Sequence, residues 1–414
     1  MICRRRGRKP RRGRTAPPFP GRLPREIVVL IGAGFVVALG YGIVAPALPA
    51  LARSFDVGVT AASAVVSVFA VVRIAFAPVS GRLLGRLGEL RVFCGGLAIV
   101  AVSSTACAVA ADFAQFLVFR AAGGVGSTMF TVAETALVIR LAPPGLRGRA
   151  AGACGTGFLL GTITGPVLGG ALATVSLRAP FLVYAALLGV AAVAAAGLLR
   201  DRSGSPPPNE PAAGSVTFTT AVAHPTFRAA LLADLLNGWT VYGVRLALVP
   251  LFVAEGLHRS SAWAGVALTA FALGTGACLH LGGRWSDRSG RRAPVLAGSA
   301  IVAVTGVALG FCTSVAALAV VSLLAGAGTG LMTPSVTAAA ADVIAAGGRD
   351  VHGGTAVAGF QMVGDAGAVV GPVVAGVVVE RAGYTAGFAT TAVIALMTFV
   401  CWLRTSDTRP RSSS

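Results

Sequence analysis

A stretch of 49 consecutive residues, 293–341, contains no Asp, Glu, Lys or Arg. A helix of that length would measure about 73 Å, whereas the hydrocarbon core of a bilayer is about 30 Å thick. The stretch therefore predicts two membrane crossings joined by a tight turn, which we expect at 311–314. A soluble core does not use so long an uncharged run. Lipid accommodates it when every backbone polar group bonds within its own helix.

The composition of the whole chain supports an all-α membrane protein. Of its 414 residues 55% are hydrophobic and only 12% are charged, and the mean hydropathy is +0.80. Apolar runs bounded by polar turns predict twelve transmembrane helices. The expected crossings are 27–51, 59–80, 92–111, 115–139, 150–174, 179–199, 227–253, 262–283, 293–312, 315–341, 354–379 and 383–403.

The net charge of +19 is arranged in a way that excludes nucleic-acid binding. Of the 34 Lys and Arg residues, 27 fall in the two termini and in the loops on one side, and only four fall in the opposite loops. This asymmetry predicts a multi-pass protein of the cell membrane with both termini in the cytoplasm. The basic tail, 1–26, is too polar to fold and is expected to lie disordered beside anionic headgroups.

A polar linker at 200–226 divides the chain into two six-helix halves, 27–199 and 227–403, followed by a cytoplasmic tail at 404–414. Short motifs recur in order in the two halves, with offsets that drift from 201 to 206. The matched elements are Tyr41-Gly42-Ile43 with Tyr242-Gly243-Val244, Gly81 with Gly283, Gly124-Val125-Gly126 with Gly328-Thr329-Gly330, and Gly161 and Gly165-Pro166 with Gly367 and Gly371-Pro372. Such repeats predict a substrate site near the midplane between the halves.

The loop after the eighth crossing carries the most specific motif, Gly-Arg-Trp-Ser-Asp-Arg-Ser-Gly-Arg-Arg at 283–292. It resembles the cytoplasmic loop Gly-x-x-x-Asp-Arg-x-Gly-Arg-Arg of the major facilitator superfamily, and the resemblance extends over 27–403. It implies two pseudo-symmetric six-helix bundles and a transport function. We expect a latch in which Asp287 accepts hydrogen bonds from a neighbouring helix N-terminus. The candidate gating residues here are Gly283, Asp287, Arg288, Gly290 and Arg291.

The first-half copy of this loop, 81–91, departs from the family pattern. Gly85 stands where the family has Asp, and Glu89 stands where it often has Arg. The gating candidates in this copy are Gly81, Arg86 and Gly88. Glu134, near the cytoplasmic end of the fourth crossing, is expected either to pair with Arg86 or Arg91 or to reach interfacial water.

Two further elements resemble the family. Arg120 opens an Arg-x-x-Gly-Gly-x-Gly run, which implies proton transfer through a nearby carboxyl group; snorkelling to the interface is the alternative. The fifth crossing has glycines at every fourth position and a proline that bends it, similar to the family's antiporter element. The residues that carry this element are Gly161, Gly165, Pro166, Gly169 and Gly170.

Ionisable residues inside crossings are costly and mark function or internal ion pairs. Asp365 and Asp234 are therefore candidate proton carriers beside Arg120 and Glu134, and a structural ion pair is the alternative for each acid. The resemblance implies that crossings 1, 4, 7 and 10 line the cavity. The candidate cavity residues are Tyr41, Asn237, Trp239, Tyr242, Arg245 and Gln361. Arg245 occupies the position equivalent to Val44, so its charge is not shared by the two halves.

The sequence thus predicts a monomeric secondary transporter in the lipid bilayer, exporting a small molecule in exchange for protons. An uptake symporter or facilitator is the alternative on the same fold, and a non-transporting sensor is a third hypothesis. We expect no enzyme, no cofactor and no metal site, because the seven Cys and four His form no cluster and no phosphate-binding GxxxxGK[ST] loop is present.

Overall fold

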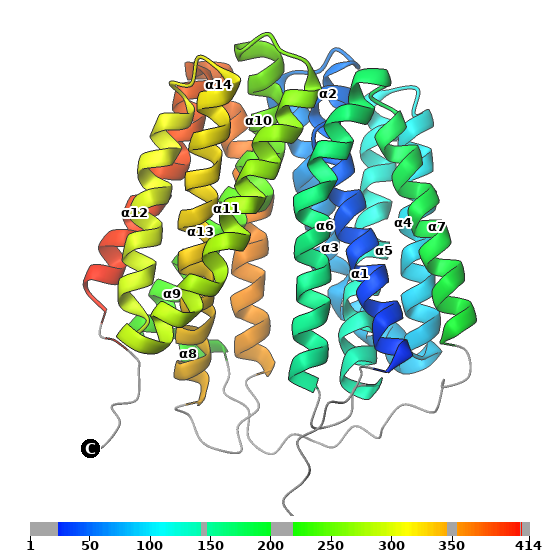
Figure 1. The fold of residues 1–414 in the computed structure, drawn as a ribbon, viewed down its shortest axis with the longest axis horizontal. Coiled ribbons are helices and arrows are strands. Elements are labelled where there is room, and N and C mark those ends of the chain that lie inside the picture. Colours follow the sequence, from blue (N-terminus) through cyan, green and yellow to red (C-terminus); the bar gives the residue numbers. More distant parts are fainter. Residues whose placement is uncertain (1–23, 142–146, 200–217, 346–353, 406, 408–414) are drawn as a thin grey trace, which may run out of the picture.

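A computed structural model describes residues 24–141, 147–199, 218–345, 354–405 and 407 (Figure 1). The described residues form helices and connecting turns. The first-half helices lie side by side on the right in Figure 1 and the second-half helices on the left. Most of the tail and linker segments predicted at 1–26, 200–226 and 404–414 lies outside the described residues.

The first half contains six long helices and one short one. Its helices are α1 (Arg25–Val44), α2 (Leu48–Arg53), α3 (Val59–Leu87), α4 (Glu89–Val109), α5 (Phe113–Leu141), α6 (Arg147–Val175) and α7 (Ala179–Leu198). The turn of α1 into α2 falls at Pro46, which lacks the N–H that would continue the helix. The expected first crossing, 27–51, is therefore two helices.

The second half follows the short helix α8 (Phe218–Val222). Its seventh crossing combines α-helical and π-helical segments. The elements are α9 (Pro225–Gly238), η3 (Trp239–Val244), α10 (Arg245–Leu251), η4 (Phe252–Gly256), α11 (Ser261–Ser289), α12 (Arg292–Leu309), α13 (Val315–Ala345) and α14 (Gly354–Leu403).

Among the described residues, eleven helices are long and apolar enough to cross a membrane. The last of them, α14, contains a break at Gly383, where φ is 81° and ψ is 172°. Division at this residue gives twelve crossings, as the apolar runs predicted. The turn expected at 311–314 is confirmed, because α12 ends at Leu309 and α13 begins at Val315.

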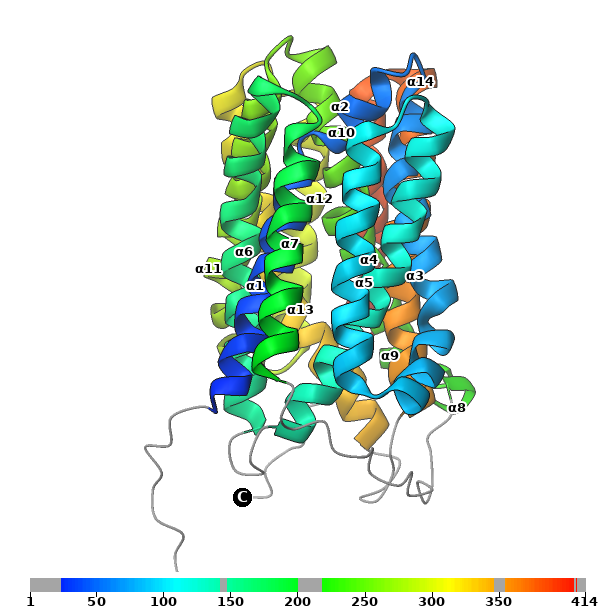
Figure 2. The same ribbon diagram turned by 90° about the vertical axis from the view of Figure 1, so that its right-hand side faces the viewer.

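Both chain ends leave the helices on the same side. We call this side, where α1 begins at Arg25 and α14 ends at Leu403, the basal end (Figure 2). The opposite side, where α2 ends at Arg53 and η4 ends at Gly256, is the distal end.

The π-helical segment η3 contains a one-residue insertion relative to the first half. Before η3, the carbonyl of Leu235 packs on Gly367 as that of Phe35 packs on Gly161, so the equivalent residues Phe35 and Leu235 are 200 apart. Near the end of η3, Gly243 faces Pro372 as Gly42 faces Pro166, so Gly42 and Gly243 are 201 apart. A single extra residue accommodated by i→i+5 bonding explains this change.

The repeat proposed for the fourth and tenth crossings was two residues out of register. Gly124 packs on the carbonyl of Phe69, and its counterpart on the carbonyl of Phe271 is Gly326. Gly126 likewise matches Gly328, so the offset is 202 and not 204. The corrected offset equals the one found for the second and eighth crossings.

The outer faces of the helices are apolar, as lipid exposure requires. Val102 exposes 70% of its surface, Val193 exposes 75% and Val175 exposes 82%. A water-soluble protein would not leave so many large aliphatic residues uncovered, whereas lipid chains solvate them.

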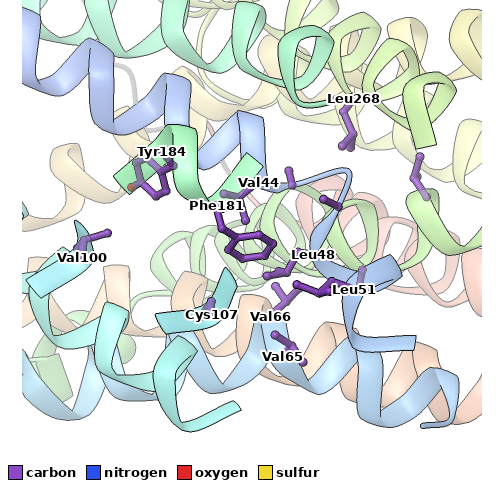
Figure 3. Packing of buried hydrophobic residues seen from close by; sticks show 14 of the residues in the cluster. Val44, Leu48, Leu51, Val65, Val66, Val100, Cys107, Phe181, Tyr184 and Leu268 are labelled. Carbon is purple, nitrogen blue, oxygen red and sulfur yellow. The ribbon is translucent and has the colours of Figure 1, made fainter. Parts of the chain in front are cut away.

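The main buried core crosses from one half to the other. One cluster joins Val44, Leu48 and Leu51 of the first half with Leu248 and Leu268 of the second, near the distal end (Figure 3). A separate cluster that includes Phe227, Val295 and Trp402 lies wholly within the second half. The two halves are therefore held together chiefly through their distal packing.

The glycines predicted in the fifth crossing form a close contact with α1. Gly161 lies against Phe35 and Leu39, Gly165 against Gly42, and Gly169 against Ile43. A Cβ at any of these glycines would overlap the α1 backbone, so small residues are required there.

We expect Gly169→Ala to destabilise the protein by about 1–3 kcal/mol, because the added methyl would collide with the Ile43 carbonyl. Gly189→Ala is the matched control, since a Cβ there has no other atom within 4 Å. The melting temperature of the control, measured on the purified protein in detergent, should be unchanged or slightly raised. Equal melting temperatures for both variants would contradict this packing.

Candidate functional site

Polar contacts join the two halves at the distal end. Arg53 Nε donates to Glu255 Oε1 at 2.7 Å, and the hydroxyl of Tyr384 donates to the second oxygen of Glu255 at 2.7 Å. The backbone N–H and the hydroxyl of Thr60 both donate to Glu380, at 2.9 and 2.7 Å. These residues, which we call the distal lock, were not identified as functional from the sequence.

Two equivalent glycine contacts reinforce the distal lock. Gly170 of α6 lies against Ala262 of α11, and Gly376 of α14 lies against Thr60 of α3. Both glycines and both partners are related by the internal repeat. The distal closure is therefore the same contact made twice about the pseudo-symmetry axis.

The basal end is arranged differently. A Cβ placed at Gly81, Gly85, Gly152 or Gly155 would meet no other atom within 4 Å. The ion pairs between Arg140 and Glu89 and between Arg291 and Asp342 each lie within one half. The described contacts between the halves thus lie at the distal end, while these basal glycines are exposed.

A cavity of about 310 Å³ lies between the halves on the basal side of the distal contacts. Its walls come from α1, α6, the seventh crossing and α11. Tyr41 and Arg245 line it, as expected. Asn237, Trp239 and Gln361 are not among its lining residues, and the side chain of Tyr242 lies outside the described residues. Helices α5 and α13, the fourth and tenth crossings, do not contribute to it.

Arg245 is the only charged residue among those that line this cavity in the described structure. It is 2% exposed, and its guanidinium carbon lies 3.9 Å from the centre of the Phe271 ring. Its Nε and Nη1 atoms have no hydrogen-bond partner among the described residues. In the seventh crossing, Arg245 is the first residue after η3.

Arg120 occupies a related environment in the first half. It is 5% exposed and lies 4.1 Å above the ring of Phe69 and 5.9 Å from that of Tyr41. Phe69 and Phe271 are equivalent in the repeat, so each half places a guanidinium on the same aromatic position. The burial of Arg120 argues against snorkelling. Its charge acts on Cys107 and Tyr184.

Asp365, Asp234 and Arg73 form an electrostatic cluster where α3 meets α14. The charge of Arg73 acts on Asp365, and that of Asp365 acts on Asp234. Asp234 also lies against the backbone of Gly364. All three side chains are half-buried. The two acids predicted separately from the sequence are thus neighbours, and Arg73 of the other half, for which pairing with an acid or snorkelling was expected, acts on one of them.

Glu134 does not make the predicted ion pair with Arg86 or Arg91, which are both exposed. Its carboxylate points into the first half, where Oε1 would lie 2.8 Å from a Cβ at Gly34 of α1. Arg140 pairs instead with Glu89 at 2.7 Å. Glu89 is the residue that departs from the family pattern, and this basic partner accounts for an acid in that loop.

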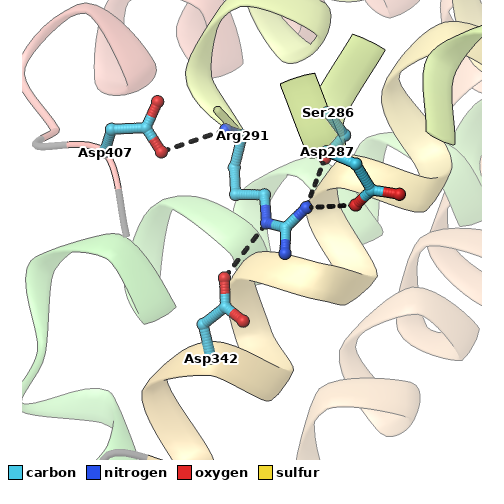
Figure 4. A network of polar contacts seen from close by, with 5 residues as sticks. All are labelled: Ser286, Asp287, Arg291, Asp342 and Asp407. Carbon is cyan, nitrogen blue, oxygen red and sulfur yellow. Dashed lines mark hydrogen bonds and ion pairs between the residues drawn. The ribbon is translucent and has the colours of Figure 1, made fainter. Parts of the chain in front are cut away.

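The second-half loop forms a network around Arg291 (Figure 4). Arg291 donates to Asp342 at 3.1 Å, to Ser286 at 3.0 Å and to Asp287 at 2.9 Å. Partial burial alone would lower the pKa of Arg291, but the hydrogen bonds to Asp342 and Asp287 outweigh it and raise that pKa. Arg291 therefore stays charged throughout the physiological range.

The expected capping by Asp287 is not found. Its side chain is 78% exposed and bonds to Arg291 in the same loop, while the N–H of Arg291 donates to Asp407 at 3.0 Å. Arg288 is exposed. Gly88 and Gly290 have φ of 81° and 90°, which explains why both loop copies need glycine there.

This geometry, two repeated bundles around a cavity with signature loops at one end, has known counterparts. The model of the Major Facilitator Superfamily matches residues 30–244 and 230–414. The chain belongs to the Major Facilitator Superfamily. Members of this superfamily and the relatives named below are transporters and not enzymes.

Two curated relatives of this superfamily member are bacterial resistance proteins. Quinolone resistance protein NorA of Staphylococcus aureus is 32% identical over 170 residues, which are 41% of this chain and 43% of NorA. Multidrug resistance protein 1 of Bacillus subtilis is 26% identical over 213 residues, 51% of this chain and 54% of that protein. The chain spans about half the length of these relatives.

Solved structures support the fold of this superfamily member over nearly its whole length. A bacterial homologue of the human lysosomal transporter Spinster, inward-facing and unoccupied, gives a TM-score of 0.73 at 16% identity, covering 92% of this chain and 97% of that one. A POT family transporter in complex with 5-aminolevulinic acid gives 0.75 at 12% identity, covering 92% and 96%. At such identities the likeness concerns the fold alone.

Proposed function

We propose that this protein is a proton-coupled exporter of small molecules that works as a monomer in the cell membrane. The excess of Lys and Arg in the loops of one side assigns the basal end to the cytoplasm. The cavity then faces the cytoplasm in this conformation, with the distal lock closed toward the exterior. The names of the two bacterial relatives, which refer to quinolone and multidrug resistance, favour export over uptake.

Transport requires the distal end to open while the basal end closes. When the distal lock opens, the halves rotate about the midplane and the basal glycines receive the opposing helices. Gly81, Gly85, Gly152 and Gly155 have the free space that such an approach needs. The Arg291 network holds the second-half loop in shape while the other half moves.

The cluster of Arg73, Asp365 and Asp234 is the site at which we place proton coupling. Arg73 lies in one half and both acids lie in the other, so the distance between Arg73 and the acids changes whenever the halves move. An unpaired carboxylate is costly away from water, and binding a proton removes its charge. Proton uptake from the exterior and release to the cytoplasm would therefore alternate with movement of the halves.

The observation that carries this proposal is the position of Asp365 at the boundary between the two halves, where the charge of Arg73 acts on it. We expect everted membrane vesicles with an acidified interior to release protons when cargo is added. The measurement is the fluorescence of an acridine pH probe, with a quinolone, ethidium and naphthalene-2-carboxylate as test compounds. Vesicles from cells that lack the protein are the control.

Recovery of fluorescence with at least one compound, absent from the control vesicles, supports exchange of cargo for protons. Accumulation of the compounds by intact cells, driven by inward proton movement, would indicate an uptake symporter instead. The absence of any flux in both orientations would indicate a protein that does not transport.

A further inference from the structure

The charge in the central cavity lacks a partner among the described residues. A buried guanidinium without a hydrogen bond or counter-ion is strongly unfavourable, and buried charges in proteins are normally paired. Arg245 is 2% exposed, and among the described residues it has no hydrogen bond or ion pair. The ring of Phe271 covers one face of the guanidinium but supplies no acceptor for its N–H groups.

No carboxylate neutralises Arg245 across the cavity, because the described lining contains no Asp or Glu. The hydroxyls of Thr162 and Thr275 donate to carbonyls of their own helices, at 2.9 and 3.0 Å, so their hydrogens do not compete with Arg245 as donors to a ligand. Most of the wall is apolar, with contributions from Phe158, Leu159 and Leu268. The cavity therefore presents one positive charge at the side of an otherwise apolar chamber.

The position of this charge distinguishes the second half from the first. The residue that matches Arg245 in the repeat is Val44, which is 1% exposed and belongs to the main core. The first-half arginine, Arg120, lies over the ring of Phe69, and it is not among the described residues that line the cavity. The scaffold shared by the two halves thus does not require a cation at Arg245.

We propose that the cargo is a small organic anion, in which a carboxylate or sulfonate binds Arg245 and an apolar body fills the chamber. A guanidinium forms strong, directed hydrogen bonds with such groups. A volume of about 310 Å³ lies at the small end of ligand pockets, which suits a one- or two-ring acid. This inference rests on the proposed transport function, because it specifies the cargo of that function.

The test is binding of matched probes to the purified protein in detergent, measured by isothermal titration calorimetry. Naphthalene-2-carboxylate and naphthalene-2-sulfonate carry the anion, 2-naphthamide is neutral, and 2-naphthylmethylammonium is a cation. We expect the two anions to bind at least about tenfold more tightly than the amide, the scale of a charge-assisted hydrogen bond. The cation should bind most weakly.

Arg245→Gln should remove this tenfold preference while leaving amide binding nearly unchanged, and Arg245→Lys should retain part of it. Arg259→Gln, in an exposed connection at the distal end, is the control that keeps the preference. Equal affinities for the anions and the amide in the natural protein would overturn the proposal. So would an anion preference that survives in a folded Arg245→Gln protein, with folding checked by its melting temperature.

The outcome is separable from that of the transport proposal, because binding in detergent needs no gradient. Proton-driven flux of ethidium without anion binding would refute the cargo class and leave the exporter intact. Anion binding that depends on Arg245, without any flux in vesicles, would refute the exporter and leave the binding site.

Discussion

Asp365→Asn is expected to reduce proton-driven flux to the level of vesicles that lack the protein. The asparagine keeps the size of the side chain but cannot exchange a proton, so the coupling step beside Arg73 is lost. Exchange of labelled for unlabelled cargo, which needs no net proton movement, should persist. If Asp365 had a purely structural role, the variant would lose driven flux and exchange together.

Two matched variants control for this result. Asp112→Asn removes an exposed carboxylate that accepts only a local hydrogen bond from the N–H of Gln115, and should leave both activities unchanged. Asp365→Glu restores an ionisable group and should recover part of the driven flux. If Asp365→Asn supports the same gradient-dependent flux as the natural protein, the coupling site lies elsewhere, and Asp234→Asn becomes the next variant to measure.

The second large effect is expected from a cross-link through the distal contact. A Cβ at Gly376 would lie 3.0 Å from the Cα of Thr60, which brings cysteines at these positions within reach of a disulfide. Oxidation of the Thr60→Cys/Gly376→Cys protein should abolish transport, because the distal lock could no longer open. Reduction should restore it, as measured by vesicle flux before and after a thiol reductant.

Each single cysteine variant, measured before and after the same oxidation, is the control, and oxidation should not change its activity. Two of the natural cysteines among the described residues, Cys107 near the end of α4 and Cys312 after α12, lie toward the distal end and are buried. The single variants therefore also report any cross-link to them. Undiminished transport by a fully cross-linked protein would show that the α3–α14 contact does not separate during the cycle.

Most crossings could be predicted to within a few residues because lipid imposes one simple requirement, a long apolar helix. The exceptions are the predicted crossings 59–80 and 262–283, whose helices continue to Leu87 and Ser289, through the polar residues that were expected to form loops. The turn near Phe311 follows from the same requirement. The register of the fourth and tenth crossings could not be fixed, because α13 has glycine at three alternate positions, Gly326, Gly328 and Gly330. Only the carbonyls on which the glycines pack show which of them match the first half.

The site was predicted less completely, for reasons of distance along the chain. Arg53 and Glu255 are single charges at the ends of the first and seventh crossings, in α2 and η4, and nothing in the sequence indicates that they meet. The same holds for Arg73 and Asp365, which come from opposite halves. The latch expected of Asp287 stays a prediction for the other conformation, because here its carboxylate bonds to Arg291. Arg245 was identified, since a charge inside an apolar segment is visible in the sequence alone.

The continuity of the main core across the distal boundary has a mechanical consequence. Because each bundle is packed as one body, the halves rotate about the midplane as rigid units. Ten helical residues span about 15 Å, so a tilt of about 10° displaces the distal and basal tips by roughly 3 Å in opposite directions. Separation at Gly170 and Gly376 is thus coupled to approach at the basal tips, so the two ends do not open together.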